Sequence, residues 1–83
     1  MTHKQLIIPG HAAQRMAERG ITKLDVRWLL ARGIHSLEET WGGTQRHGKR
    51  GMVGHREAMV VYIETATTIE LITAEWTDEK PER

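Results

Sequence analysis

His11, Arg15 and Glu18 are spaced so that they share one face of a helix, with Arg19 at its edge. A histidine can take or give a proton near neutral pH, and the planar guanidinium of arginine suits a phosphate. This pattern indicates phosphodiester chemistry. The other interpretation is a solvated helix face with a weak ion pair, which contributes little to stability.

RNA is a suitable substrate for such a face because its ribose 2′-hydroxyl supplies the nucleophile. An enzyme then needs a base, an acid and a cation near the phosphoryl oxygens, and no metal is obligatory. The five histidines show no close pair at chelating spacing, and the chain has no cysteine. We therefore expect neither a metal site nor a cofactor.

A second candidate is the basic stretch from residue 46 to residue 56. The net charge of the whole chain is only +1, so the excess of positive charge is local to this stretch. We expect it to bind the phosphate backbone of a nucleic acid. The residues assigned to this role are Arg46, Lys49, Arg50, His55 and Arg56. The glycine-rich stretch 42–54 that contains most of them fits either one long bent strand or a mobile loop. His47 and His55 are further candidates for a direct chemical role, and the other interpretation is that each is an ordinary surface residue.

Two helices are expected before the strands. The first spans His11 to Arg19, buries Ala12, Ala13 and Met16, and ends at Gly20. The second runs from Lys23 to Arg32. Thr22 and Asp25 form a capping box at its start, and Gly33 stops it. Local signals of several kinds agree at these boundaries.

Alternating apolar residues after the helices predict strands, including residues 58–63 and 68–76, joined by a hairpin. Residues 5–8 indicate a short edge strand or an extended segment that leads into the first helix. The expected fold class is α+β, with two N-terminal helices on a twisted antiparallel sheet of about four strands. Thr73 should lie on the buried face of its strand. The expected core residues are Val26, Leu29, Leu30, Val61, Ile63, Ile69 and Leu71.

The length of 83 residues fits one domain, taken as residues 1–76 with a polar tail over 77–83. No stretch is long and apolar enough to cross a membrane, and the opening residues do not resemble a signal peptide. These features predict a cytoplasmic location. A domain this small gains stability if a partner covers apolar surface, so a homodimer or a protein partner is expected. The three tryptophans are expected to anchor the core or an interface.

The stretch His11-Ala12-x-x-Arg15-Met16-x-Glu18-Arg19-Gly20-Ile21 resembles the opening of a small family of uncharacterised bacterial domains. That family is grouped with the barnase, EndoU, colicin and RelE superfamily of ribonuclease toxins. The resemblance implies helices packed on a four-stranded antiparallel sheet, a metal-independent toxin-type ribonuclease, RNA as substrate and an antitoxin as partner.

The same resemblance implies His11 and Arg15 as the leading catalytic residues, with Arg19 and Thr73 as further candidates. Because a fold does not determine a function, an alternative stays open. The domain would then be a non-enzymatic binding module, either an adaptor or an antitoxin-like protein, that binds a protein or a nucleic acid.

Overall fold

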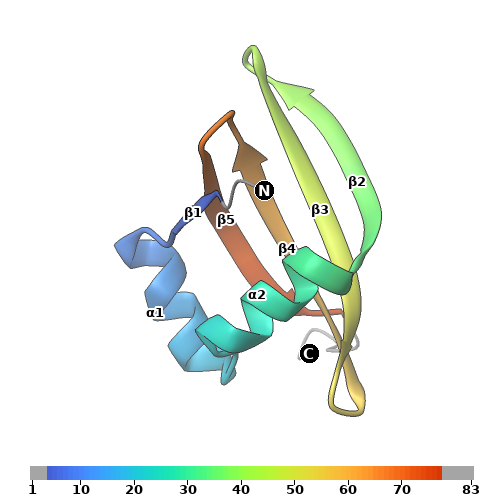
Figure 1. The fold of residues 1–83 in the computed structure, drawn as a ribbon. Coiled ribbons are helices and arrows are strands. Elements are labelled where there is room, and N and C mark those ends of the chain that lie inside the picture. Colours follow the sequence, from blue (N-terminus) through green and yellow to red (C-terminus); the bar gives the residue numbers. More distant parts are fainter. Residues whose placement is uncertain (1–3, 78–83) are drawn as a thin grey trace, which may run out of the picture.

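The computed structural model describes residues 4–77, and the expected α+β architecture is confirmed (Figure 1). Both helices precede the long strands and pack on one side of a five-stranded sheet. Apart from Thr77, the tail expected over 77–83 lies outside the described residues. In chain order the elements are β1 (Gln5–Ile7), α1 (Gly10–Arg19), α2 (Lys23–Arg32), β2 (Ile34–Trp41), β3 (Thr44–Val53), β4 (Arg56–Glu64) and β5 (Thr68–Trp76).

The helix boundaries follow from the expected capping residues. Gly20 ends α1 in the left-handed region, with φ of 72°. The Thr22 hydroxyl accepts the Asp25 N–H, and the Asp25 carboxylate accepts the Thr22 N–H, which completes the predicted capping box of α2. Gly33 ends α2 in an extended conformation. A Cβ there would lie 2.5 Å from the carbonyl oxygen of Leu29, so the close approach requires glycine.

The strand order is β1-β5-β4-β3-β2, and every neighbouring pair is antiparallel except β1 with β5. The prediction of a fully antiparallel sheet of about four strands was therefore wrong for β1, which is a fifth strand parallel to β5. Leu6 pairs with Ile69, 63 positions later. A parallel pair needs a long connection, and here both helices and three strands supply it.

The glycine-rich stretch forms a turn and a strand. Gly42 and Gly43 have φ of 60° and 81°, which fits a tight two-residue turn between β2 and β3. The chain then continues as β3 to Val53, and Gly54 and His55 make the next turn. The strand alternative for residues 42–54 is thus correct, and the basic residues within it belong to a paired strand.

The core lies between the helices and the sheet, and the expected burial of Ala13 and Ile63 was wrong. Ala12 and Met16 are buried on α1, but Ala13 is exposed. On β4 the helix-facing residues are Ala58, Val60 and Tyr62. The expected residues Val61 and Ile63 point to the other face, where Val61 is nonetheless buried, at 8% exposed, and Ile63 is only partly buried. Both sets are apolar, so their hydrophobicity did not distinguish the two faces of β4.

A β-bulge explains the error at Thr73. The register shifts between Val61, which pairs with Thr73, and Tyr62, which pairs with Leu71. Ile72 is the extra residue on β5, so Leu71 and Ala74 are both buried. Thr73 is only partly buried and does not share the core face with Leu71. Simple alternation therefore fails at this point of the strand.

No helix within residues 4–77 is long and apolar enough to cross a membrane. Both helices have 10 residues.

Gly48 lies in the middle of β3 beneath the side chain of Leu37. A Cβ at position 48 would lie 2.7 Å from the Leu37 Cβ, which cannot move without its strand. We expect Gly48→Ala to lower the free energy of unfolding by about 1–3 kcal/mol, as for other overpacked sites. Urea denaturation measures this change.

The control is Gly10→Ala, because a Cβ at that helical position meets nothing within 4 Å. It should leave stability unchanged or slightly higher. Equal stability of the Gly48→Ala variant and the parent would contradict the close packing of Leu37 on β3.

Candidate functional site

The two leading sequence candidates, His11 and Arg15, lie on the exposed side of α1. Within residues 4–77 the side chain of neither residue makes a hydrogen bond or an ion pair. Their spacing does place them on one face, but that face points away from the residues that pack on the sheet, Ala12 and Met16. Their catalytic role stays a prediction.

Arg19 and Thr73 meet at the other end of α1. The Arg19 Nη1 lies 3.5 Å from the Thr73 hydroxyl and donates to the Ala74 carbonyl at 2.9 Å. The Trp76 indole donates to the Arg19 carbonyl at 2.7 Å. These bonds fasten α1 to β5. Because Arg19 is eight residues beyond His11, roughly 12 Å along the helix, the four catalytic candidates do not form one site.

The basic residues of the 46–56 stretch are divided between two faces of the sheet. Lys49 and Arg56 lie on the face that carries the helices, where Lys49 contacts α2 and Arg56 covers the Trp76 ring at 4.1 Å. Arg46 and Arg50 alternate with Lys49 on β3 and lie on the opposite face. His55 is in the β3–β4 turn. These residues therefore do not make one continuous phosphate track.

A different group of titratable side chains does come together, on the helix-bearing face beyond the C-terminal end of α2. We call it the histidine cluster. It contains Lys4, His35, His47, Lys49, Tyr62 and Glu64. Its members come from β2, β3, β4 and the residue before β1, so only the folded sheet assembles them. Of these, Lys49 was assigned to phosphate binding from the sequence, and His47 was named as a candidate for a chemical role.

Two imidazoles form the centre of this cluster. His35 Nε2 lies 3.3 Å from His47 Nδ1, which is hydrogen-bonding distance. The His47 ring also stacks on the Tyr62 ring, with centroids 5.6 Å apart and planes inclined by 28°. Tyr62 is 3% exposed, so its ring is held in place by the core and supports the stacked ring of His47. His35 is exposed at the edge strand and can move more freely.

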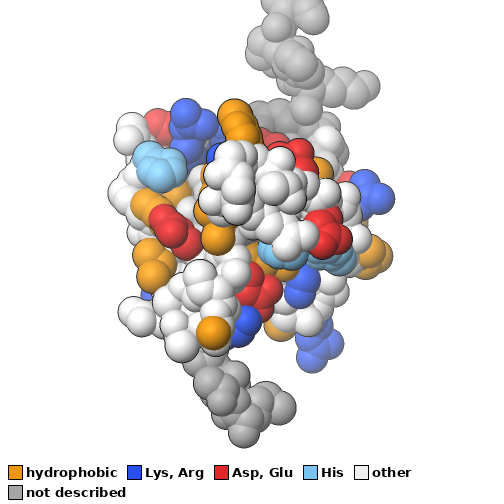
Figure 2. Space-filling model, turned by 90° about the horizontal axis from the view of Figure 1, so that it is seen from above, with side chains coloured by type: hydrophobic (Ala, Val, Ile, Leu, Met, Phe, Trp, Pro, Cys, Tyr) orange, Lys and Arg blue, Asp and Glu red, His pale blue; other side chains and the backbone are white. Residues whose placement is uncertain are grey.

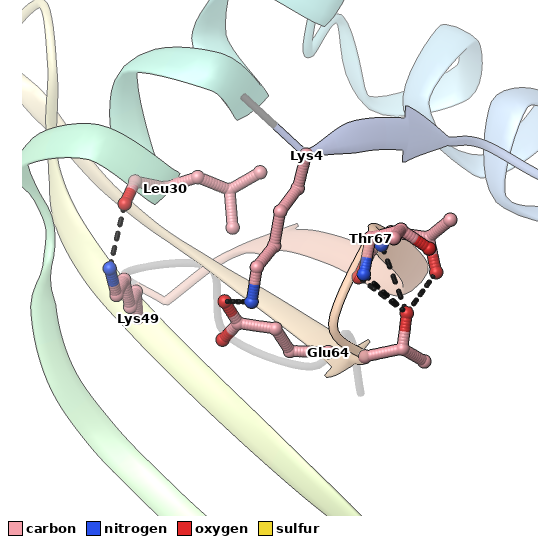
Figure 3. Close-up of polar contacts among 7 residues, drawn as sticks. Lys4, Leu30, Lys49, Glu64 and Thr67 are labelled. Atoms are coloured by element: carbon pink, nitrogen blue, oxygen red, sulfur yellow. Dashed lines mark hydrogen bonds and ion pairs between the residues drawn. The ribbon is translucent and has the colours of Figure 1, made fainter. Parts of the chain in front are cut away.

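Two lysines belong to the cluster, and Figure 3 shows their contacts with Leu30 and Glu64. Lys49 donates to the Leu30 carbonyl at 2.7 Å, in the last turn of α2. A cation is favourable there because unpaired carbonyls leave the helix C-terminus negative. Lys4 pairs with Glu64 at 2.6 Å. An ammonium group has three donors, so each lysine keeps two for a ligand.

The charges of the cluster shift two of its pKa values. Burial, and then the negative charge of Glu64, raise the pKa of Tyr62, so its hydroxyl stays protonated at neutral pH. The hydrogen bond from Lys4 lowers the pKa of Glu64 despite some burial, and the positive charges of Lys4, His47 and Lys49 lower it further. The cluster thus holds a neutral phenol beside an ionised carboxylate.

The pKa of Glu64 offers a test of this geometry. Replacing Lys4 by Met should raise the pKa of the Glu64 carboxyl toward its usual range, because the first cause of the lowering is removed. NMR titration of the Glu64 side-chain carboxyl measures it. A lowered folded-state pKa stabilises the protein above the unfolded pKa, and this stabilisation is lost as pH falls through the folded value. The variant should therefore lose less stability in acid.

The matched control is Lys23→Met, which removes the same charge from the exposed first turn of α2. It should leave the Glu64 pKa as it is. An unchanged Glu64 pKa in the Lys4→Met variant would show that the ion pair does not hold in solution.

A hollow of about 190 Å³ adjoins the cluster between α2 and the β1–β5 edge. Lys4 belongs to both, and Leu30, whose carbonyl accepts from Lys49, lines the hollow. Its apolar walls include Leu6 and Ile69, and Arg27 adds a second cation at its rim. Figure 2 looks down on this end of the molecule, where histidine side chains lie among acidic and basic ones. An apolar recess beside cations and imidazoles suits a ligand with a flat ring and a phosphate.

No family model, curated protein or solved structure matches this chain.

Sequence reasoning missed the cluster because its partners are distant along the chain. His35 and His47 are 12 residues apart, but the β2–β3 hairpin brings them together. Counting back from the Gly42-Gly43 turn does not reveal the contact, because an unbroken register would place His35 opposite Arg50, on the other face from His47. The register shift between His35 and Leu37 instead pairs His35 with Lys49, on the face of His47.

Proposed function

We propose that this protein is a metal-independent ribonuclease of the toxin type that acts at the histidine cluster. The observation that carries the proposal is the hydrogen bond between His35 and His47. In such a bond one ring nitrogen donates and the other accepts, so of the two facing nitrogens one carries a proton and the other does not. Cleavage of RNA by its own 2′-hydroxyl needs one proton acceptor and one proton donor.

The proposed reaction uses the two rings in turn. One imidazole takes the proton from the 2′-hydroxyl as its oxygen attacks phosphorus. The bond from phosphorus to the 5′-oxygen breaks, and the other imidazole gives that oxygen a proton. The products are a 2′,3′-cyclic phosphate and a 5′-hydroxyl end. The tautomer of each ring decides which is the base, and the substrate displaces the direct imidazole contact.

The neighbours of the imidazoles suit the charge that develops on the phosphoryl oxygens. Lys49 offers two free donors beside His35, which is its partner across β2 and β3. The Tyr62 hydroxyl, kept protonated by its raised pKa, can donate as well. The hollow lined by Leu6, Leu30 and Ile69 would take a base, with Arg27 near the next phosphate.

The resemblance of the α1 segment to ribonuclease toxins supports the same activity but implies a different site, at His11 and Arg15. We propose that those residues contact the substrate outside the reacting centre, since both are exposed and mutually unbonded within residues 4–77. A cytoplasmic location and an antitoxin partner are part of the proposal.

The direct test is to incubate the pure protein with a mixed pool of RNA, with and without EDTA, and to analyse the ends. Cleavage that persists with EDTA and leaves 2′,3′-cyclic phosphates is expected. Intact RNA under both conditions would overturn the proposal. Cleavage that needs a divalent ion would overturn the two-imidazole mechanism.

A second candidate function, the binding module, is favoured by a different surface. An apolar hollow of about 500 Å³ lies between α2 and the β3–β4 turn. Leu24, Trp28 and Met52 line it and are 77%, 44% and 49% exposed. Large exposed apolar groups mark protein-binding sites. If RNA stays intact, a Trp28→Ala variant that loses a captured protein partner would support this function.

A further inference from the structure

The face of the sheet opposite the helices, here the open face, is apolar along its middle. The β4 residues Met59, Val61 and Ile63 alternate with the core residues and therefore point to this side. Leu37 on β2 covers Gly48 beside Val61. Ile34, at the start of β2, is 70% exposed. No helix within residues 4–77 packs on this face (Figure 1).

Charged rows flank this apolar strip on both sides. β3 carries Arg46 and Arg50, and β5 carries Glu70 and Glu75. All four alternate with residues of the helix-bearing face and so lie on the open face. One side of the strip therefore carries two arginines, with Glu39 of β2 beside Arg46, and the other side carries two glutamates.

The register places these charges at matching heights. Arg50 pairs with Met59, and Met59 pairs with Glu75, so these three residues form a line across β3, β4 and β5. Ile63 of β4 pairs with Glu70 of β5. On the other side of β4, Tyr62 pairs with His47 of β3. Arg46, next to His47, therefore lies beside Ile63 and level with Glu70. Each arginine has one glutamate opposite it, two strands away, roughly 10 Å.

This pattern is complementary to itself. If two open faces meet about a two-fold axis that runs along β4, the axis exchanges β3 with β5. Arg50 then lies over Glu75 of the partner subunit, and Arg46 over Glu70 of the partner subunit. A two-fold axis across the strands would instead place β3 over β3, with arginine against arginine. The charges therefore select one arrangement.

We propose that the protein forms a two-fold homodimer in which the open faces of two sheets pack together, with β3 of each copy over β5 of the other. The apolar strips of the two copies interdigitate as in a β-sandwich, in which sheets lie about 10 Å apart. Trp41, 64% exposed and covered by Arg46 at 4.5 Å, flanks the contact. Tryptophan and arginine are typical of such interfaces.

A nucleic acid fits this face less well than a second copy does. Glu70 and Glu75 would repel phosphates, while they complete the pairing with arginines in the dimer. The dimer also leaves the histidine cluster uncovered, because the cluster is on the helix-bearing side. The dimer therefore does not depend on the proposed ribonuclease activity, and its test is separate.

Sedimentation equilibrium tests the proposal. The parent should sediment at twice the chain mass of 9.5 kDa. Arg50→Glu and Glu75→Arg should each raise the dimer dissociation constant on the order of tenfold or more, since each places like charges together at two symmetric positions. The double variant Arg50→Glu/Glu75→Arg should restore the parental constant, because opposite charges meet again.

The control is Arg27→Glu, an equal charge change on the exposed side of α2. It should leave the dimer intact, and circular dichroism should show that every variant is folded. A parent that stays at 9.5 kDa at all concentrations overturns the proposal. A folded double variant that remains as weak as the single variants overturns the stated pairing of β3 with β5.

Discussion

Replacing His47 by Ala is expected to slow RNA cleavage by about 10²–10⁴-fold, the usual contribution of one general acid or base. His47 is held on the buried ring of Tyr62 and bonded to His35, so no other imidazole can take its place in the cluster. His35→Ala should lose a similar factor. The double variant should be little slower than either single variant, because the two rings act as one unit.

Initial rates on a short RNA of defined sequence measure these effects. The parent should show a bell-shaped dependence of kcat/KM on pH, and each single variant should lose one side of the bell. The matched control is Gln14→Ala on the exposed side of α1, which should cleave like the parent.

The His11→Ala variant distinguishes the two candidate sites. It should raise KM and change kcat little if His11 only contacts the substrate. Full activity of His47→Ala together with loss of kcat in His11→Ala would move the reacting centre to α1. The sequence resemblance would then have located the site correctly.

Replacing Leu29 by Ala is expected to lower the free energy of unfolding by about 2–5 kcal/mol, the range for a leucine truncated in a packed core. Leu29 is fully buried and lies where α2 meets the sheet, against Gly51 of β3. A domain of this size has only about 5–15 kcal/mol of stability, so the variant should unfold at a clearly lower denaturant concentration.

Leu24→Ala is the matched control, since it makes the same truncation on the same helix at a side chain that is 77% exposed. Its effect should be within about 0.5 kcal/mol. Equal losses for the two variants in urea denaturation would mean that α2 does not bury the face described.

The helices were predicted well because their signals are local. The capping signals act within one or two turns of the helix, and they come from Gly20, Thr22, Asp25 and Gly33. The predicted helix boundaries agree with the structure to within one residue. The assignment of α2 to Lys23–Arg32 was correct at both ends. Capping depends on neighbouring residues alone, so the helix boundaries can be recognised in a single sequence.

The sheet was predicted less well because its errors depend on distant partners. The inward face of β4 follows from which side the helices cover, and residues 58–63 are apolar on both sides. The bulge at Ile72 and the parallel pairing of β1 leave no local pattern. The histidine cluster is missed for the same reason. Imidazoles on two strands become neighbours only through the register.

The pairing of β1 with β5 has a consequence for the order in which the protein is made. Lys4 directly precedes β1, and β1 is held by β5, the last strand along the chain, so the ion pair between Lys4 and Glu64 at the end of β4 depends on β5. A ribosome releases β1 long before β5. Strands β2, β3 and β4 can already pair through their short turns. Lys4 reaches Glu64 only after β5 has emerged and paired with β1. The cluster is therefore incomplete on the growing chain and is completed once translation has passed β5.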